Sequence, residues 1–222
     1  MTTRAIVTGA GGRMGKTVLA LAEETQGIDI VFGADPSVGT SLASCGAEAD
    51  VVIDFSIAAA LPETLDFCVS RKLPLVLATT GHDASGMQAV KAAAEQIPIL
   101  VSANLSLGAL VVSRLVREAR NLLAEAYDVT ILETHHRAKR DAPSGTAKML
   151  AAAMDMPDAT TLSIRGGGVF GTHEVRFLGD MDVITVRHEA IDRRLFAKGA
   201  LVAARWVAGR APGLYVLDDV FV

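Results

Sequence analysis

The sequence predicts an α/β protein in which a doubly wound parallel sheet is followed by a second, smaller α+β domain containing a mixed sheet. Residues 1–106 alternate short, continuously apolar strands with helical stretches, which is typical of a parallel sheet covered on both faces. A glycine-rich loop lies between the first strand and the first helix. Beyond residue 107 the strands alternate polar and apolar residues instead, as in antiparallel or mixed sheets.

The first domain is expected to begin with a strand at Arg4–Val7, followed by the glycine loop and a helix at Met14–Glu24. The run Val51-Val52-Ile53 has no polar residue, so its strand should be buried on both faces. Further strands are expected at Ile28–Ala34, Asp50–Phe55, Leu75–Ala78 and Ile97–Ser102, and further helices at Leu61–Ser70 and Ala84–Glu95.

A second domain is predicted over residues 107–196, opening with one long helix at Leu107–Ala124. The segment His173–Leu178 alternates polar and apolar side chains, so its strand should bury only one face. Residues 197–222 are expected to return to the first domain through a helix within Leu195–Ala208 and a strand-like LYVLDDVFV end. Other strands of this domain are expected at Asp128–Glu133, Thr160–Ile164 and Asp182–Arg187.

The composition of the 222-residue chain excludes several classes of protein. Half of the residues are hydrophobic, which argues against disorder, and the net charge of −4 with interspersed signs argues against nucleic-acid binding. No apolar run approaches the ~20 residues that span a bilayer, and the N-terminus enters a strand at once, so we expect neither membrane association nor a signal peptide. Cys45 and Cys68 lack metal or redox spacing, which favours a cytoplasmic protein.

The glycine loop VTGAGGRMG indicates a dinucleotide site of the Rossmann type. Glycines permit a tight turn and a close approach of the backbone to a ligand, and the following helix offers unpaired N–H groups to a pyrophosphate. The spacing here is G-x-x-G-x-x-G, with Gly11 as an additional glycine, rather than the usual G-x-G-x-x-G. The predicted cofactor contacts in this loop are Gly9, Ala10, Gly11, Gly12, Arg13 and Met14.

Asp35 closes the second predicted strand, about 20 residues after the loop, where an acid binds the adenosine ribose hydroxyls. The alternative is a turn residue, since Asp-Pro is common in turns. Pro36 follows directly, where an arginine would have contacted a 2′-phosphate, so NADH is favoured over NADPH. Arg13 could still bind that phosphate, which leaves NADPH open.

The segment HHRAKRDAPSGTA, from His135, has the residues of a proton-transferring anion site. Histidine titrates near neutral pH, and Lys139 adds a full positive charge. Ser144-Gly145-Thr146 opens a helix, whose N-terminus attracts carboxylates. We therefore expect a site that holds a carboxylate and donates a proton beside it. Metal binding is disfavoured, because adjacent histidines point apart on a strand and no third ligand is evident.

Structural roles for the same residues are also open. Ser144 could serve only as the cap of its helix. Asp141 could pair with Arg137 or Arg140 and have no other function.

HHRAKRDAPSGTA resembles the signature of the 4-hydroxy-tetrahydrodipicolinate reductase (dihydrodipicolinate reductase) family. Other segments along nearly the whole chain resemble the family in the same order: GAGGRMG, DFS at Asp54, LATTG at Leu77, SANLSLG at Ser102 and IRGGGVFGTHEV at Ile164. The resemblance implies reduction of 4-hydroxy-tetrahydrodipicolinate, a cyclic imine dicarboxylate, by NADH or NADPH in diaminopimelate and lysine biosynthesis. It also implies a homotetramer assembled through the sheets of the second domain.

The resemblance also implies roles for individual residues. His135 would be the proton donor or acceptor and Lys139 a second acid, while His136, Ser144, Gly145 and Thr146 would hold the substrate carboxylates. The cofactor would further contact Ala78, Thr79, Thr80, Ser102, Ala103, Asn104 and Leu105, with Ala78 standing where the family usually has glycine. Two alternatives remain: another two-domain NAD(P)-dependent dehydrogenase, or a non-catalytic nucleotide-sensing protein.

Overall fold

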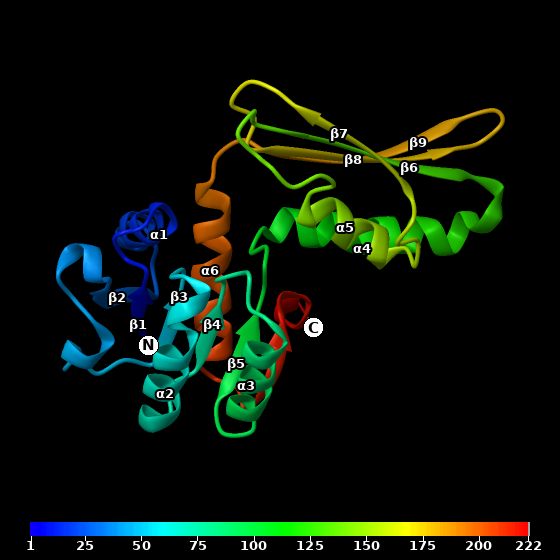
Figure 1. The fold of residues 1–222 in the computed structure, drawn as a ribbon. Coiled ribbons are helices and arrows are strands. Elements are labelled where there is room, and N and C mark those ends of the chain that lie inside the picture. Colours follow the sequence, from blue (N-terminus) through cyan, green and yellow to red (C-terminus); the bar gives the residue numbers. More distant parts are fainter. Residues whose placement is uncertain (222) are drawn as a thin grey trace. The chain divides into compact units, whose positions relative to one another are not determined.

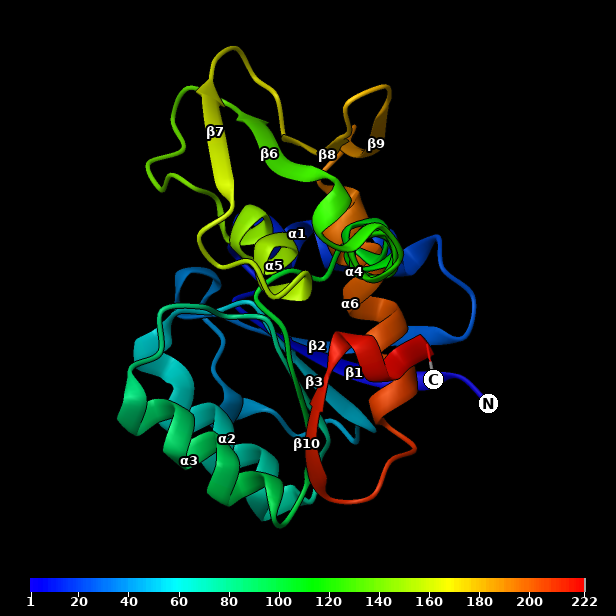
Figure 2. The same ribbon diagram turned by 90° about the vertical axis from the view of Figure 1, so that its right-hand side faces the viewer.

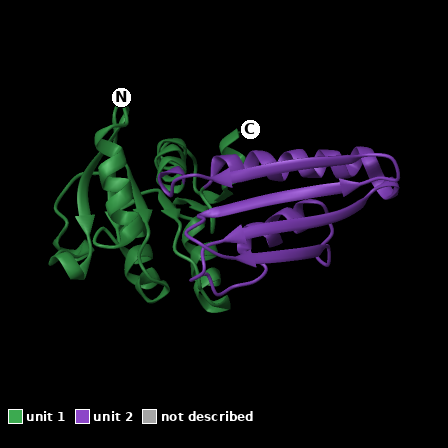
Figure 3. Ribbon diagram, turned by 90° about the horizontal axis from the view of Figure 1, so that it is seen from above, with its two compact units in different colours: residues 1–105, 196–222 green, residues 106–195 purple. Residues whose placement is uncertain are grey.

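The computed structural model describes residues 1–221, which divide into two compact units (Figure 3). Unit 1 comprises Met1–Leu105 together with the described residues from Phe196 onward. Unit 2 comprises Ser106–Leu195. Among the described residues, no helix has both the length and the apolar character needed to cross a membrane.

Unit 1 contains a six-stranded sheet in the order β10-β5-β4-β3-β1-β2, in which all paired strands are parallel. The central strands β3 and β4 are buried along their whole length, as the unbroken apolar runs predicted. The carboxyl ends of the parallel strands therefore meet at one edge of the sheet, where α/β proteins bind their ligands. The strands are β1 (Thr3–Thr8), β2 (Ile28–Ala34), β3 (Val51–Asp54), β4 (Leu75–Leu77), β5 (Pro98–Val101) and β10 (Gly213–Val216).

Helices cover both faces of this sheet. Figures 1 and 2 show α2 and α3 on one face and α6 on the other. The helices are α1 (Arg13–Glu23), α2 (Leu61–Arg71), α3 (Ala84–Ala94) and α6 (Arg194–Val207), and short 3-10 turns lie at Pro36–Val38, Leu42–Ser44, Ala58–Ala60 and Leu217–Phe221. The predicted doubly wound parallel sheet is confirmed.

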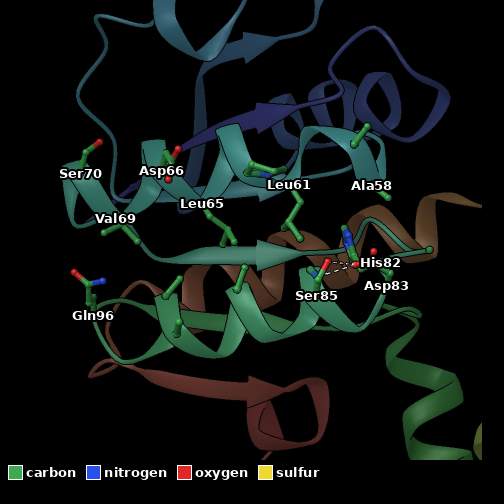
Figure 4. A pocket seen from close by; sticks show the side chains of 17 residues that line it. Ala58, Leu61, Leu65, Asp66, Val69, Ser70, His82, Asp83, Ser85 and Gln96 are labelled. Carbon is green, nitrogen blue, oxygen red and sulfur yellow. Dashed lines mark hydrogen bonds between the residues drawn. The ribbon is translucent and has the colours of Figure 1, made fainter.

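A hollow of about 810 Å³ lies between α2 and α3 (Figure 4). Leu61, Leu65 and Val69 line it from α2, and small side chains of α3 face them. Asp83 caps α3 at one end, where its carboxylate accepts a hydrogen bond of 2.7 Å from the Gly86 N–H. No residue that the sequence predicts for the functional site is among the described residues that line this hollow.

Unit 2 contains a four-stranded sheet in the order β7-β6-β8-β9. The β6–β7 pair is parallel and the other pairs are antiparallel, so the predicted mixed sheet is confirmed. Two helices, α4 and α5, lie on the same side of the sheet (Figure 1), and alternate residues of β6 and β8 are buried against them. The elements are α4 (Leu107–Leu123), the 3-10 turn Ala124–Ala126, β6 (Asp128–His135), α5 (Gly145–Ala153), β7 (Thr160–Arg165), β8 (Gly171–Leu178) and β9 (Val183–Ala190).

The prediction of a strand-like structure over the segment LYVLDDVFV is wrong for most of its residues. Only its first residues belong to β10, which pairs with β5, and Leu217–Phe221 form a 3-10 turn. The reason lies in the two aspartates, because the Asp219 carboxylate accepts a hydrogen bond of 2.8 Å from the Val216 N–H and bends the chain. The last residue of the predicted segment, Val222, lies outside the described residues.

Candidate active site

The loop between β1 and α1 turns so tightly that glycine is required at two positions. Gly9 has φ +72°, and a Cβ there would lie 2.3 Å from the Phe55 carbonyl oxygen. A Cβ on Gly15 would lie 2.1 Å from the carbonyl oxygen of Gly9. The Gly12 N–H donates a 3.0 Å hydrogen bond to that same oxygen, which closes the turn. The glycines therefore let the backbone of this loop lie close to the segment that follows β3 and to the start of α1.

The N-terminus of α1 is suited to an anion. Gly12 is the N-cap residue in an extended conformation, so it makes no side-chain cap bond, and the first helical N–H groups have no partner within the helix. The first turn contains no acidic residue, but it contains Arg13 and Lys16. Positive side chains and a helix N-terminus together attract the pyrophosphate of a dinucleotide. These residues fit an NAD(P)H cofactor.

Asp35 follows β2 and organises the loop from the opposite side. Its carboxylate accepts hydrogen bonds from the Gly11 N–H at 3.0 Å and from the Ser37 N–H at 2.8 Å. The hydrogen bonds from Ser37 and Gly11 lower the pKa of Asp35, so the carboxylate is ionised at neutral pH. Each carboxylate oxygen can accept a second hydrogen bond, so the carboxylate retains acceptor capacity for the predicted contact with ribose hydroxyls.

Two cavities are lined by half of the predicted cofactor contacts. One of about 210 Å³ is lined by Gly9 and Asp35, together with residues that follow β3. Another of about 510 Å³ is lined by Arg13 and Met14 and by the segment Ala78–Thr80 that follows β4. The structure thus brings together segments that the sequence alone could not place side by side.

The segment Ser102–Leu105 follows β5 and lines neither of these two cavities. The Ser102 N–H donates to the Leu77 carbonyl at 3.1 Å. Leu105 packs against α6 so closely that a Cβ on Gly199 would lie 1.7 Å from the Leu105 oxygen. Cofactor contacts of this segment remain a prediction.

Gly15→Ala is expected to weaken NADH binding by at least about tenfold, because the added methyl forces the Gly9 carbonyl and the turn to move. The dissociation constant, measured from the fluorescence of bound NADH, checks this expectation. Gly46→Ala is the matched control, since a Cβ on Gly46 meets nothing within 4 Å. A Gly15→Ala protein that binds NADH like the control would contradict the proposed site.

In unit 2, His135 is the last residue of β6 and lies in a buried cluster of charged groups. Its Nδ1 forms a hydrogen bond with the Oε2 of Glu133, whose side chain has no exposed surface. The Arg165 guanidinium, at the end of β7, binds both oxygens of the same carboxylate, at 2.7 and 2.8 Å. Glu133 is therefore held from two sides within the sheet.

This environment sets the charge of each group. Burial would raise the pKa of Glu133, but hydrogen bonds from Arg165, Ser163 and His135 outweigh it and lower that pKa to about 2. Burial lowers the pKa of His135, and the Glu133 carboxylate opposes that effect. Burial also lowers the pKa of His173 to about 4, so its ring is neutral near pH 7. The cluster thus holds one fixed anion beside a histidine that can take up or release a proton.

Two residues of β8 complete the surroundings of His135. The His173 ring lies edge-on to the His135 ring, with centroids 5.0 Å apart, and its Nε2 lies 3.0 Å from the Ser144 Oγ. A Cβ on Gly171 would lie 2.9 Å from the Nε2 of His135. The absence of a side chain at position 171 therefore leaves room beside that nitrogen.

Lys139 and the N-terminus of α5 lie on the loop that follows His135. Lys139 forms an ion pair of 2.9 Å with Asp141, so the pairing of Asp141 with Arg137 or Arg140, considered from the sequence, is wrong. Ser144 is buried and caps α5, where its Oγ accepts from the Ala147 N–H at 3.2 Å.

The first residue of α5, Gly145, has open space around it, since a Cβ there would meet nothing within 4 Å. His136 lies on the loop that follows β6, and Thr146 is the second residue of α5; both are half-buried. The substrate contacts predicted for His136, Ser144, Gly145 and Thr146 remain predictions.

The first unit has a parallel sheet with a glycine loop, and the second has a buried histidine on a strand that leads into a lysine and a helix N-terminus. These features are typical of the class of nicotinamide-dependent oxidoreductases. Within this class, residues 3–105 match the family model for the N-terminus of dihydrodipicolinate reductase, and residues 108–221 match that for its C-terminus. The chain belongs to the dihydrodipicolinate reductase family, as the resemblance of its sequence indicated.

Individual relatives agree with this family. The chain is 39% identical to the 4-hydroxy-tetrahydrodipicolinate reductase of Caldanaerobacter subterraneus subsp. tengcongensis, covering 99% of this chain and 98% of the relative. It is 38% identical to that of Rickettsia bellii, covering 97% and 93%. A solved dihydrodipicolinate reductase from Paenisporosarcina sp. TG-14, with dipicolinate bound, has the same fold, with a TM-score of 0.81 over 99% of both chains at 22% identity.

Proposed function

We propose that this chain reduces 4-hydroxy-tetrahydrodipicolinate to tetrahydrodipicolinate, with NADH as the favoured hydride donor and His135 as the proton donor. Membership of the family makes the chain an NAD(P)H-dependent oxidoreductase of diaminopimelate and lysine biosynthesis. The observation that carries the proposed residue roles is the buried His135, held by Glu133 on the strand that leads into Lys139 and α5.

The reaction requires loss of water from the 4-hydroxy compound, then addition of one hydride and one proton. The bound dinucleotide supplies the hydride. His135 gives the proton to the resulting enamine from a ring nitrogen, and it regains a proton from solvent. Glu133 does not take this role, because it stays ionised near pH 7 and has no proton to give.

The N-terminus of α5 and Lys139 bind the carboxylates of the substrate in this proposal. Gly145 leaves the helix end open, so a carboxylate can approach the N–H groups of the first turn. Lys139 adds a charge-assisted hydrogen bond, for which the substrate competes with Asp141. His136 and Thr146 complete the set of proposed contacts. Positive groups around a dianion also stabilise the charge that develops in the transition state.

We also propose that the chain forms a homotetramer through the sheet of unit 2. Because α4 and α5 lie on the same side, the other face of the sheet is not covered by them. That face displays apolar side chains with substantial exposure, namely Leu162, Ile164, Leu178 and Val183. A second copy of the same sheet would bury them, and symmetric association is the usual outcome for such a face.

The proposed function is tested by a coupled assay. The upstream synthase generates the cyclic substrate from pyruvate and aspartate semialdehyde, and the loss of reduced-nicotinamide absorbance is followed with NADH and, separately, with NADPH. We expect oxidation that requires both enzymes, with a higher kcat/KM for NADH because Asp35 and Pro36 offer no positive charge to a 2′-phosphate. Equal or higher kcat/KM with NADPH would contradict the cofactor preference. No oxidation by a folded protein that binds NADH would contradict the proposed activity.

A further inference from the structure

The carboxylate of Glu133 has no role in the chemistry described so far, although it is completely buried beside the reacting histidine. Glu133 and His135 are two residues apart on β6, so both side chains lie on the face of the sheet that the helices cover. Arg165 binds both carboxylate oxygens, and the Ser144 N–H donates to Oε1 at 3.2 Å. A buried charge with this many donors is fixed in place.

The contact between Glu133 and His135 determines which ring nitrogen can transfer a proton. An ionised carboxylate accepts hydrogen bonds but cannot donate them, so Nδ1 of His135 must carry a hydrogen. In the neutral ring Nε2 is then unprotonated, and in the imidazolium Nε2 carries the proton that can leave. Nε2 is also the atom that lies beside Gly171, where a Cβ would come within 2.9 Å.

We propose that Glu133 is a positioning residue for His135: it fixes the ring through Nδ1 and makes Nε2 the proton-donating atom, and Gly171 keeps the space beside Nε2 open. Arg165 holds Glu133 in this position. The inference rests on the proposed role of His135 as proton donor. It adds residues of three neighbouring strands, β6, β7 and β8, to the site.

Several charged or titratable groups act on His135 together. The Glu133 anion favours the imidazolium, whereas burial and the cationic Lys139 and Arg165 disfavour it. His173 faces the ring from β8 and is neutral. Once the Glu133 charge is removed, only influences that disfavour the imidazolium remain, so the pKa of His135 must fall.

The test is Glu133→Gln, measured as kcat against pH. Because the donor must be protonated, kcat falls as pH rises through the pKa of His135. We expect this falling limb of the pH profile to move about one pH unit towards acid, so that kcat at pH 7.5 falls about tenfold or more. KM should change less than about threefold. Lower kcat with an unmoved limb would assign Glu133 a purely structural role and overturn the proposal.

Further variants keep the test decisive. Glu174→Gln is the matched control, because Glu174 pairs with Arg176 on the opposite face of the same sheet, and it should leave the limb in place. If Glu133→Gln does not fold because Arg165 loses its partner, the double variant with Arg165→Gln removes both charges. A smaller acid shift is then expected, because the Arg165 cation that opposes the imidazolium is lost as well. Gly171→Ala should lower kcat at least about tenfold without moving the limb, since it obstructs Nε2 and leaves Glu133 intact.

A measurement on the wild-type protein separates this inference from the proposed function. Nitrogen-15 NMR of the labelled histidine side chains is expected to show that Nδ1 of His135 is protonated throughout and that Nε2 titrates. A neutral ring with the proton on Nε2 would overturn the inference, whatever the activity. Absence of turnover with this tautomer present would instead count against the proposed function alone.

Discussion

Replacing His135 with glutamine is expected to lower kcat by about 10²- to 10⁴-fold, the contribution of a well-placed general acid. Glutamine can still form a hydrogen bond with Glu133, but it has no proton to give near neutral pH. Because His135 lies in unit 2 and the glycine loop in unit 1, affinity for NADH should stay within about twofold. Steady-state kinetics with the cyclic substrate and a separate NADH titration together measure both quantities.

His188→Gln is the control for this variant. His188 is on β9 of the same sheet, its ring packs against Gly108, and burial lowers its pKa as it does that of His135. Within residues 1–221 its Nδ1 is buried without a hydrogen-bond partner, so it has no carboxylate in the place of Glu133, and its Nε2 lies 3.5 Å from the Ser106 hydroxyl. We expect kcat within about threefold of wild type for the control. Equal kcat for His135→Gln and the control would remove His135 from the mechanism.

The sequence predicts the parts of this protein that depend on local patterns. Continuous apolar runs such as Val51–Ile53 identify buried parallel strands, and alternation in His173–Leu178 identifies a strand with one buried face. The glycine loop is also local, since the strand, the turn and the helix follow one another directly. The terminal segment was predicted wrongly because its apolar residues suggest a strand, whereas its two aspartates favour a turn.

The partners of His135 depend instead on how distant strands are aligned. Glu133 could have been found, because a spacing of two on a strand places both side chains on one face. Arg165 and His173 could not, since they reach the cluster only through the register of β6 with β7 and β8, which no local pattern specifies. The role of Gly171 likewise becomes visible only when the His135 ring lies beside it.

Lys139→Met is expected to lower kcat/KM by about 100-fold, because a charge-assisted hydrogen bond to a carboxylate contributes about 1.5–3 kcal/mol. Methionine keeps the length of the lysine stem, with sulfur in place of one methylene, and lacks the ammonium group. The variant also leaves the Asp141 carboxylate without its partner near a dianionic substrate, which adds repulsion. If Lys139 only binds the ground state, the loss lies in KM; if it acts as a second acid, part of the loss lies in kcat.

Arg140→Met is the control, since Arg140 is the exposed neighbour of Lys139 on the same loop and carries the same charge. If the loop attracts the substrate only through its net positive charge, losing one charge would lower kcat/KM similarly in both variants. Added salt would then reduce both effects. A specific contact predicts a large loss only for Lys139→Met, because a bound carboxylate is held by one ammonium in a defined position, not by the net charge of the segment. Equal losses in the two variants would therefore contradict the placement of Lys139 in the site.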